Sequence, residues 1–275
     1  MRPMEVGVFL CSTAIEDPFE SATKLHEIGI NNTQIGPLPP GFYTDENAAK
    51  LKAHLADLGI PPTTLFVGFP GESYANMAAV KATVGLLIPE TIAERKAILR
   101  RAIDFTAKLG APRVALHIGF VPADSSDPAY AKLIDDIREI ADACSAAGLG
   151  LSLETGQETG EEMRHFLETV DRPNIGINFD PANMILYGKD KPIEALETLR
   201  RYVVSVHCKD GIWPTREGEL GSETPLGQGQ VDIPAFVAKL KEIGYAGPLT
   251  IEREAGDDRI GDILRGKDLL ERLRG

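Results

Sequence analysis

Helical periodicity and short apolar runs alternate along the chain. Residues 128–146 carry the helical pattern most clearly, because Asp127 and Pro128 are typical of a helix start and apolar residues follow at helical spacing. These are Tyr130, Leu133, Ile134, Ile137, Ile140, Ala141 and Cys144. The pattern predicts a helix with one buried face, to which Cys144 belongs. A second helix is expected over 89–109, with Thr91 and Glu94 forming a capping box at its start.

Glycine marks the end of five predicted helices and the approach to a strand. Glycine is favoured at a helix end because it adopts the left-handed backbone conformation without steric cost. A short apolar run follows each of these positions within a few residues. The five positions are Gly29, Gly59, Gly110, Gly148 and Gly244. Helices and strands are therefore expected to alternate throughout the chain.

Eight apolar runs are expected to form strands, and a helical stretch follows each. They lie near residues 5–10, 31–35, 62–67, 113–118, 149–154, 174–179, 202–207 and 248–252. Eight such units predict an α/β protein with a closed (β/α)8 TIM barrel, in which residues 1–275 form one domain. The doubly wound alternative is weakened because no glycine-rich dinucleotide-binding motif follows the first strand. Residues 69–87 and 210–230 are predicted loop insertions on the catalytic face.

Charge and cysteine content narrow the functional classes. The net charge of −12 repels nucleic acid phosphates and anionic lipid headgroups, so neither nucleic acid nor a membrane is expected as a partner. The three cysteines, Cys11, Cys144 and Cys208, are odd in number and far apart, which favours reduced thiols. The first apolar run is too short for a signal peptide, and no run is long enough to cross a bilayer, so a cytoplasmic location is expected.

The last four predicted strands each end in one side chain that can bind a metal. These residues are Glu154, Asp180, His207 and Glu252. One such residue alone would be a helix cap, a loop residue or a core histidine, but the ends of neighbouring barrel strands face the same bowl, so four in register should converge. Three carboxylates repel one another unless a cation lies between them. Three oxygen donors and one imidazole suit one divalent metal ion, with manganese expected first and magnesium, cobalt or zinc as alternatives.

Five sequence motifs lie at or near these strand ends. They are LETG at 153–156, NFDPAN at 178–183, VHCKD at 206–210, PLGQGQVD at 225–232 and GYAGPLTIE at 244–252. Together they resemble the xylose-isomerase-like TIM barrels, which comprise sugar phosphate isomerases and epimerases and the AP endonuclease family 2 barrels. The resemblance covers essentially the whole chain and is strongest from the fourth strand onward. It is specific for the superfamily and not for a substrate.

The resemblance implies both a fold and a chemistry. Glu154, Asp180, His207 and Glu252 match the family's metal ligands, and Glu154 and Glu252 also match the acid/base pair of its ketose 3-epimerases. It therefore implies a metal-dependent isomerase or epimerase acting on a ketose or sugar phosphate. The expected reaction begins with proton abstraction next to a metal-bound carbonyl. A small-molecule carbohydrate is the expected partner, and a homodimer or homotetramer is implied.

Several further residues are expected to bind substrate. His117 ends the fourth strand and is expected to contact substrate or transfer a proton, in preference to a core role. Lys209 either binds a phosphate or substrate oxygen or pairs with Asp210. Trp213 either stacks on a sugar face or packs within its loop. Arg216 is expected to clamp the substrate, as an arginine in this loop does in the epimerases, although its spacing from the strand-seven histidine is looser than theirs.

Asn183 is the fifth expected substrate contact, and it departs from the family pattern. Several ketose epimerases carry a histidine three residues after the strand-six aspartate, where this chain has Asn183. Their substrate specificity therefore does not transfer directly to this chain.

Three other functions compete with the epimerase. A metal-dependent lyase that cleaves 3-keto glycosides by β-elimination uses the same proton abstraction and is the main alternative. A DNA-repair nuclease of this superfamily needs additional histidines, whereas the chain has five in all and is acidic. A catalytically silent sugar-binding barrel would not require both Glu154 and Glu252.

Overall fold

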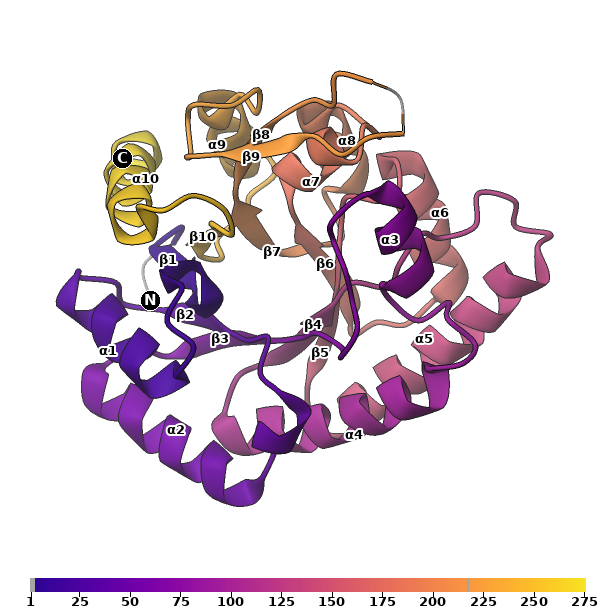
Figure 1. The fold of residues 1–275 in the computed structure, drawn as a ribbon, viewed down its shortest axis with the longest axis horizontal. Coiled ribbons are helices and arrows are strands. Elements are labelled where there is room, and N and C mark those ends of the chain that lie inside the picture. The colour runs from indigo at the N-terminus through magenta and orange to yellow at the C-terminus, as the bar shows by residue number, and fades with distance from the viewer. Residues whose placement is uncertain (1–2, 217) are drawn as a thin grey trace.

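Eight parallel strands close into a barrel in the computed structural model, which describes residues 3–216 and 218–275 (Figure 1). Their order around the barrel is β1-β10-β7-β6-β5-β4-β3-β2. The first and last strands pair in register Val6↔Leu249, which closes the sheet. The strands are β1 (Val6–Phe9), β2 (Thr33–Ile35), β3 (Pro62–Val67), β4 (Arg113–Leu116), β5 (Gly150–Glu154), β6 (Ile175–Phe179), β7 (Val203–Cys208) and β10 (Leu249–Ile251). The predicted (β/α)8 TIM barrel is confirmed.

Helices surround the barrel (Figure 1). The α-helices are α1 (Pro18–Glu27), α2 (Asp45–Leu58), α3 (Met77–Thr83), α4 (Ile92–Leu109), α5 (Pro128–Ala146), α6 (Gly160–Val170), α7 (Pro181–Leu186), α8 (Pro192–Leu199), α9 (Ile233–Glu242) and α10 (Arg259–Arg274). Two 3-10 turns, η1 (Leu10–Thr13) and η2 (Pro40–Phe42), follow β1 and β2. The last helix, α10, packs against β1 and β10, so the two ends of the described chain meet at one side of the barrel.

Most of the predicted helix boundaries are confirmed. The five glycines expected to end helices all have positive φ, between 70° and 91°. Asp127 caps α5, because its side chain accepts a hydrogen bond from the backbone of Ala129, and Pro128 is the first helical residue. Cys144 is fully buried on the inner face of α5, and burial raises the pKa of its thiol to about 12.

The predicted capping box at Thr91 and Glu94 is wrong. Thr91 has helical backbone angles, φ −113° and ψ −11°, and its side chain makes no capping hydrogen bond; its hydroxyl instead donates to the carbonyl of Ile88 at 3.3 Å. A capping residue needs an extended backbone to place its oxygen over the first turn. Thr159 has that backbone and forms a true capping box with Glu162 at the start of α6.

Both predicted insertions contain secondary structure of their own. Residues 69–87 include α3, and residues 210–230 include a two-stranded antiparallel hairpin, β8 (Asp210–Ile212) paired with β9 (Ser222–Thr224). Figure 1 shows α3 and the hairpin on the side where the chain leaves β3 and β7. These two segments therefore form part of the rim around the barrel mouth.

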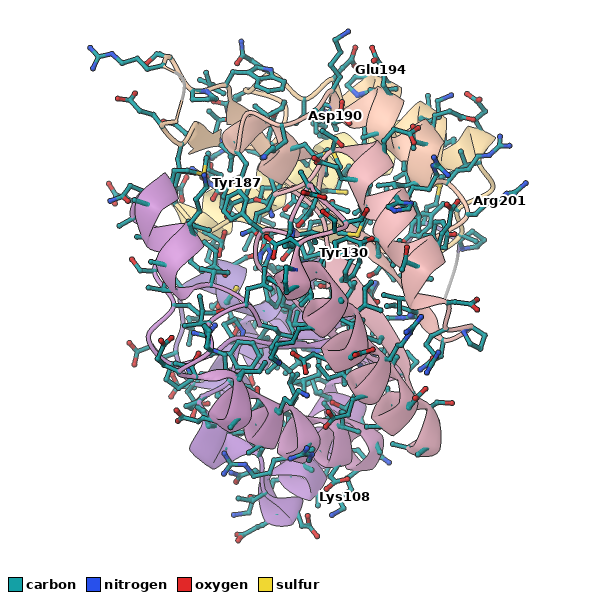
Figure 2. All side chains as sticks on the ribbon, turned by 90° about the vertical axis from the view of Figure 1, so that its right-hand side faces the viewer. Lys108, Tyr130, Tyr187, Asp190, Glu194 and Arg201 are labelled. Atoms are coloured by element: carbon teal, nitrogen blue, oxygen red, sulfur yellow. The ribbon has the colours of Figure 1, made fainter. Side chains whose placement is uncertain are left out.

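Apolar side chains fill the space between the barrel and its helices, while charged side chains face outward. In Figure 2, Lys108, Glu194 and Arg201 project from the periphery, whereas Tyr130 and Tyr187 lie within the body of the protein and are buried. Among the described residues, no helix is both long and apolar enough to span a bilayer. A rigid, well-packed barrel of this kind holds the strand ends in fixed positions, which a catalytic site requires.

Candidate active site

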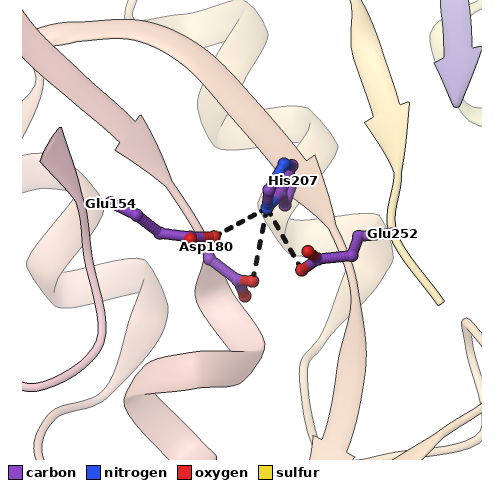
Figure 3. Close-up of side chains that lie close together, drawn as sticks. All are labelled: Glu154, Asp180, His207 and Glu252. Carbon is purple, nitrogen blue, oxygen red and sulfur yellow. Dashed lines mark hydrogen bonds and ion pairs between the residues drawn. The ribbon is translucent and has the colours of Figure 1, made fainter. Parts of the chain in front are cut away.

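Four polar side chains converge at the carboxyl ends of neighbouring strands. One ligand atom from each lies within 4.8 Å of the others, and all four side chains are buried (Figure 3). Glu154 ends β5, Asp180 follows β6, His207 lies in β7 and Glu252 follows β10. The residues in this group, Glu154, Asp180, His207 and Glu252, are called the ligand cluster below. The structure brings together every residue that the strand ends predicted as a ligand.

Asp180 shows how one side chain can serve both the fold and the ligand cluster. Its Oδ1 accepts hydrogen bonds from the backbones of Ala182 at 2.8 Å and Asn183 at 3.0 Å, which caps α7. Its Oδ2 is buried and has no hydrogen-bond partner among the described residues. A buried carboxylate oxygen without a partner is costly, and a cation in the cluster would satisfy it.

A hydrogen-bond relay fixes the orientation of His207. Asn178 Oδ1 accepts from Gln34 Nε2 at 3.2 Å, which turns Gln34 Oε1 toward His207 Nε2 at 2.8 Å. Since an amide oxygen only accepts, Nε2 carries a proton, so Nδ1 presents a lone pair whenever the ring is neutral. The rings of Phe9 and Phe66 stack against the same imidazole, at centroid distances of 5.3 and 5.6 Å. The histidine is therefore held with Nδ1 facing the cluster.

Nδ1 of His207 faces three carboxylates. It lies 2.7 Å from Glu154 Oε1, 3.1 Å from Glu252 Oε2 and 3.7 Å from Asp180 Oδ2. Burial disfavours a charged imidazole, but these carboxylates outweigh burial and raise the pKa of His207 well above its ordinary value. One proton can serve only one of the oxygens, whereas a divalent ion can bind all of them. The three oxygens and one nitrogen thus fit a cation such as manganese, magnesium, cobalt or zinc.

His117 contacts the opposite side of Glu154. Its Nε2 lies 2.7 Å from Glu154 Oε2. Burial lowers the pKa of His117, but Glu154 outweighs burial and raises that pKa to about 9. Burial would likewise raise the pKa of Glu154, yet His117 and His207 hold it well below its usual range. Glu154 is therefore an ionised carboxylate that borders the cavity.

Lys209 lies beside Glu252. Its Nζ is 2.9 Å from Glu252 Oε2 and also pairs with Glu254, the second residue beyond Glu252. Burial works against the charged amine, but Glu252 and Glu254 raise the pKa of Lys209 well above its ordinary value. The predicted alternative of a pair with Asp210 is wrong. The carboxylate of Asp210 instead accepts backbone hydrogen bonds from Gly227, Gly229 and Val231.

The ligand cluster opens into a cavity of about 360 Å³, near the lower end of the range for small-molecule sites. His117, Asn183 and Lys209, three of the five expected substrate contacts, line this cavity. Trp213 and Arg216 lie in the segment between β8 and β9 and line a separate depression, where the Arg216 side chain is 81% exposed and lies 3.7 Å from Glu219. The structure does not bring these two residues to the cavity, and their contact with substrate stays a prediction.

Several residues of the site escaped the sequence analysis. Glu72 and Tyr74, from the 69–87 insertion, line the cavity, as do Glu223 and Glu254. Gln34 lies in the three-residue strand β2 and is buried. The available signal in the sequence was an amide side chain within a predicted strand, since a buried polar side chain needs a partner. Nothing in the local sequence marks the loop residues, because their position depends on how the insertions fold over the barrel.

Comparisons with known proteins identify relatives of this chain. A ketose 3-epimerase from Arthrobacter globiformis is 30% identical over 248 residues, which cover 84% of this chain and 76% of that protein. The crystal structure of a xylose isomerase domain protein from Planctomyces limnophilus superimposes with a TM-score of 0.92 at 40% identity, covering 99% of this chain and 97% of that one.

A more distant relative carries a different name. The L-ribulose-5-phosphate 3-epimerase UlaE of Salmonella paratyphi C (strain RKS4594) is 26% identical over 182 residues, or 63% of this chain. The chain spans 62% of that protein's length, less than two thirds. The sequence profile of the xylose isomerase-like TIM barrel family matches residues 23–273. The chain belongs to the xylose isomerase-like TIM barrel family.

Proposed function

We propose that the protein is a divalent-metal-dependent sugar epimerase or isomerase whose ligand cluster holds the ion. The single observation that carries this proposal is the pair of buried carboxylates, Glu154 and Glu252, which share the cluster and both border the cavity. A divalent ion held there would polarise a substrate carbonyl and acidify the neighbouring C–H bond. Glu154 and Glu252 are the groups that would move the proton.

The chain's own residues supply both halves of a proton transfer. One carboxylate removes the proton from the carbon next to the carbonyl, and the other, which enters protonated, returns a proton to the opposite face or to the neighbouring carbon. The roles exchange in the reverse direction, as reversibility requires. His117 lies beside Glu154 and Lys209 beside Glu252, so a basic side chain is next to each of the two carboxylates.

The relatives support this choice of reaction. The Arthrobacter protein is named a ketose 3-epimerase and the Salmonella protein an L-ribulose-5-phosphate 3-epimerase. Inversion of a carbon next to a carbonyl can begin with loss of its proton. We infer the same substrate class, a small carbohydrate, for this chain. His117, Asn183 and Lys209 are the proposed substrate contacts, since all three line the cavity.

Solvent exchange tests the proposal. The manganese-loaded enzyme is incubated in D₂O with a panel of ketoses, and the products are read by mass and by NMR. Epimerisation should place deuterium at the inverted carbon, and aldose–ketose isomerisation should place it on a neighbouring carbon. A hydride-shift isomerase would leave every carbon unlabelled after many turnovers, which would reject the two-carboxylate mechanism. Metal-free protein is the matched control and should give neither product nor label.

A lyase acting on 3-keto glycosides is the second candidate. The observation that favours it is the apolar side of the cavity, formed by Phe9, Tyr74, Leu186, Tyr187 and Leu220, which could hold a leaving group. The first step is the same, but the following step expels the group β to the carbonyl. Incubation with a 3-keto glycoside separates the two reactions, because an epimer keeps the mass of its substrate whereas elimination releases a free aglycone.

A further inference from the structure

We infer that the cavity binds a sugar without a phosphate group, because the protein's own carboxylates occupy the positions at which this fold would hold one. This inference rests on the proposed function, since it concerns the substrate of the same site. In TIM barrels, phosphate is commonly held by the loops after the seventh and eighth strands, through backbone N–H groups and cationic side chains. In this chain those loops follow β7 and β10.

The loop after β7 forms a nest of backbone N–H groups around Asp210. Oδ1 of Asp210 accepts from Gly211 at 2.8 Å and Val231 at 3.0 Å, and Oδ2 accepts from Gly227 and Gly229 at 2.9 Å each. A Cβ atom on Gly229 would lie 2.2 Å from Oδ1, so the backbone closes tightly on the carboxylate. Asp210 is fully buried and fills this anion site.

A second internal carboxylate closes the loop after β10. The backbone N–H of Glu254 lies 3.0 and 3.1 Å from the two carboxylate oxygens of Glu223, on β9. Nη1 of Arg253 donates to the same carboxylate at 2.6 Å, and its Nε donates to Asp262 at 2.8 Å. Arg253, the residue after Glu252, is therefore already paired with two carboxylates.

The other cations near the cavity are paired in the same way. Five glutamates line the cavity, against His117 and Lys209 as the only lining residues that can carry positive charge within the part of the chain that the structure describes. Arg95 does not line the cavity but pairs with Glu72, which does. The pairs are His117 with Glu154, Lys209 with Glu252 and Glu254, Arg95 with Glu72, and Arg253 with Glu223.

A phosphate ester and a free sugar would meet this cavity very differently. A phosphate would have to displace a carboxylate from its cation while facing the remaining glutamates, and juxtaposed like charges are strongly unfavourable. Sugar hydroxyls are hydrogen-bond donors, and carboxylate oxygens accept from them. The apolar wall that includes Tyr74 and Leu220 can cover C–H faces of the ring. The lining thus matches a neutral polyol.

Calorimetric titration with matched ligand pairs tests the inference. The manganese-loaded protein is titrated with L-ribulose and L-ribulose 5-phosphate, then with D-fructose and D-fructose 6-phosphate, and turnover is followed in parallel. The phosphate ester should bind at least about tenfold more weakly in each pair. A smaller difference, tighter binding of the ester, or no binding of either free ketose would overturn the inference.

Two charge-neutralising variants locate the discrimination. Glu254→Gln removes one of the two carboxylates that pair with Lys209. The ratio of the Kd of the phosphate ester to the Kd of the free ketose should therefore fall by about threefold or more. Glu219→Gln makes the same change on the hairpin outside the cavity and should leave the ratio as in the wild type. Equal narrowing in both variants would attribute the effect to overall charge and reject the local account.

The parallel turnover assay separates this inference from the proposed function. Preferred binding of free ketoses without any epimerisation or isomerisation would reject the proposed reaction and leave the inference standing. Preferred binding and turnover of the phosphate esters would reject the inference and leave the proposed reaction standing.

Discussion

The two halves of the barrel mouth differ in chemistry. In the half formed by β5, β6, β7 and β10, each strand ends in a member of the ligand cluster. In the other half, β1, β2, β3 and β4 end in Phe9, Ile35, Val67 and Leu116, which are all buried and apolar. The difference shows that the members of the ligand cluster all come from one half of the mouth, whereas the strands of the other half end in apolar side chains.

Two polar residues of the apolar half reach across the mouth. Gln34 on β2 contacts His207, and His117 after β4 contacts Glu154. Both act on members of the ligand cluster, from strands that contribute no member themselves. A TIM barrel can thus divide its rim between residues that carry the chemistry and residues that orient them.

Removal of the metal should have the largest effect, because all four members of the ligand cluster, in the half of the mouth formed by β5, β6, β7 and β10, would lose the ion that they bind. Chelation is expected to abolish turnover and to lower the Tm. An ion whose free concentration is 100 times its Kd stabilises the native state by about 2.7 kcal/mol, and chelation removes this contribution. Atomic absorption and differential scanning calorimetry measure the metal content and Tm. His207→Ala should weaken manganese binding, whereas His165→Ala, on the outer helix α6, should not. Full activity without measurable metal would contradict the assignment.

Glu252→Gln tests whether the charged half does more than bind metal. The amide keeps one coordinating oxygen but cannot accept the proton, so kcat should fall about 100-fold or more. Steady-state kinetics at saturating manganese give kcat and KM separately, and calorimetry checks that the metal still binds. Turnover near that of the wild type would reduce Glu252 to a ligand.

Gln34→Leu tests the contribution of the apolar half. Loss of the acceptor for His207 Nε2–H should weaken manganese binding by about 10- to 100-fold, the usual effect of removing a group that orients a metal-bound histidine. Gln34→Glu restores an acceptor and should recover most of the affinity. Metal affinity equal to the wild type in Gln34→Leu would show that packing by Phe9 and Phe66 suffices to hold the imidazole.

Glu158→Gln should have the smallest effect on turnover but a distinct effect on stability. Glu158 is buried beside α6 without lining the cavity, its Oε2 has no partner among the described residues, and burial raises its pKa from 4.5 to about 8. The unfolded chain loses this proton near pH 4.5 and the native state near pH 8. The native state therefore binds more protons between these values, and wild-type stability falls as pH rises through that window.

The variant should remove this loss. As pH rises from 5 to 8, the unfolding free energy of Glu158→Gln minus that of the wild type should increase by on the order of 2–4 kcal/mol. Urea unfolding at both pH values measures the difference. Glu161→Gln neutralises an exposed carboxylate three residues away and should keep the wild-type profile. Parallel profiles for Glu158→Gln and the wild type would mean that Glu158 is ionised in the native state.

The sequence by itself determined the barrel and the ligand cluster. Helix periodicity, the glycines at helix ends and short apolar runs are local signals, and each was enough to place one element. The ligand positions followed from a single rule, because every strand of a parallel barrel points its carboxyl end at the same mouth. Glu154, Asp180, His207 and Glu252 needed no knowledge of their side-chain contacts, since strand order alone brings them together.

Only the tertiary structure decided which partner each polar side chain takes. Gln34 and His207 are 173 positions apart and form a hydrogen bond, and Lys209 pairs with Glu252 and Glu254 and not with the adjacent Asp210. Thr91 does not cap its helix because of its backbone angles, and Trp213 and Arg216, in the segment between β8 and β9, line a depression separate from the cavity. A hydrogen bond or ion pair is made or lost when the distance between two atoms changes by a few tenths of an ångström, and these atoms lie in segments remote in sequence. The local sequence pattern does not encode such distances.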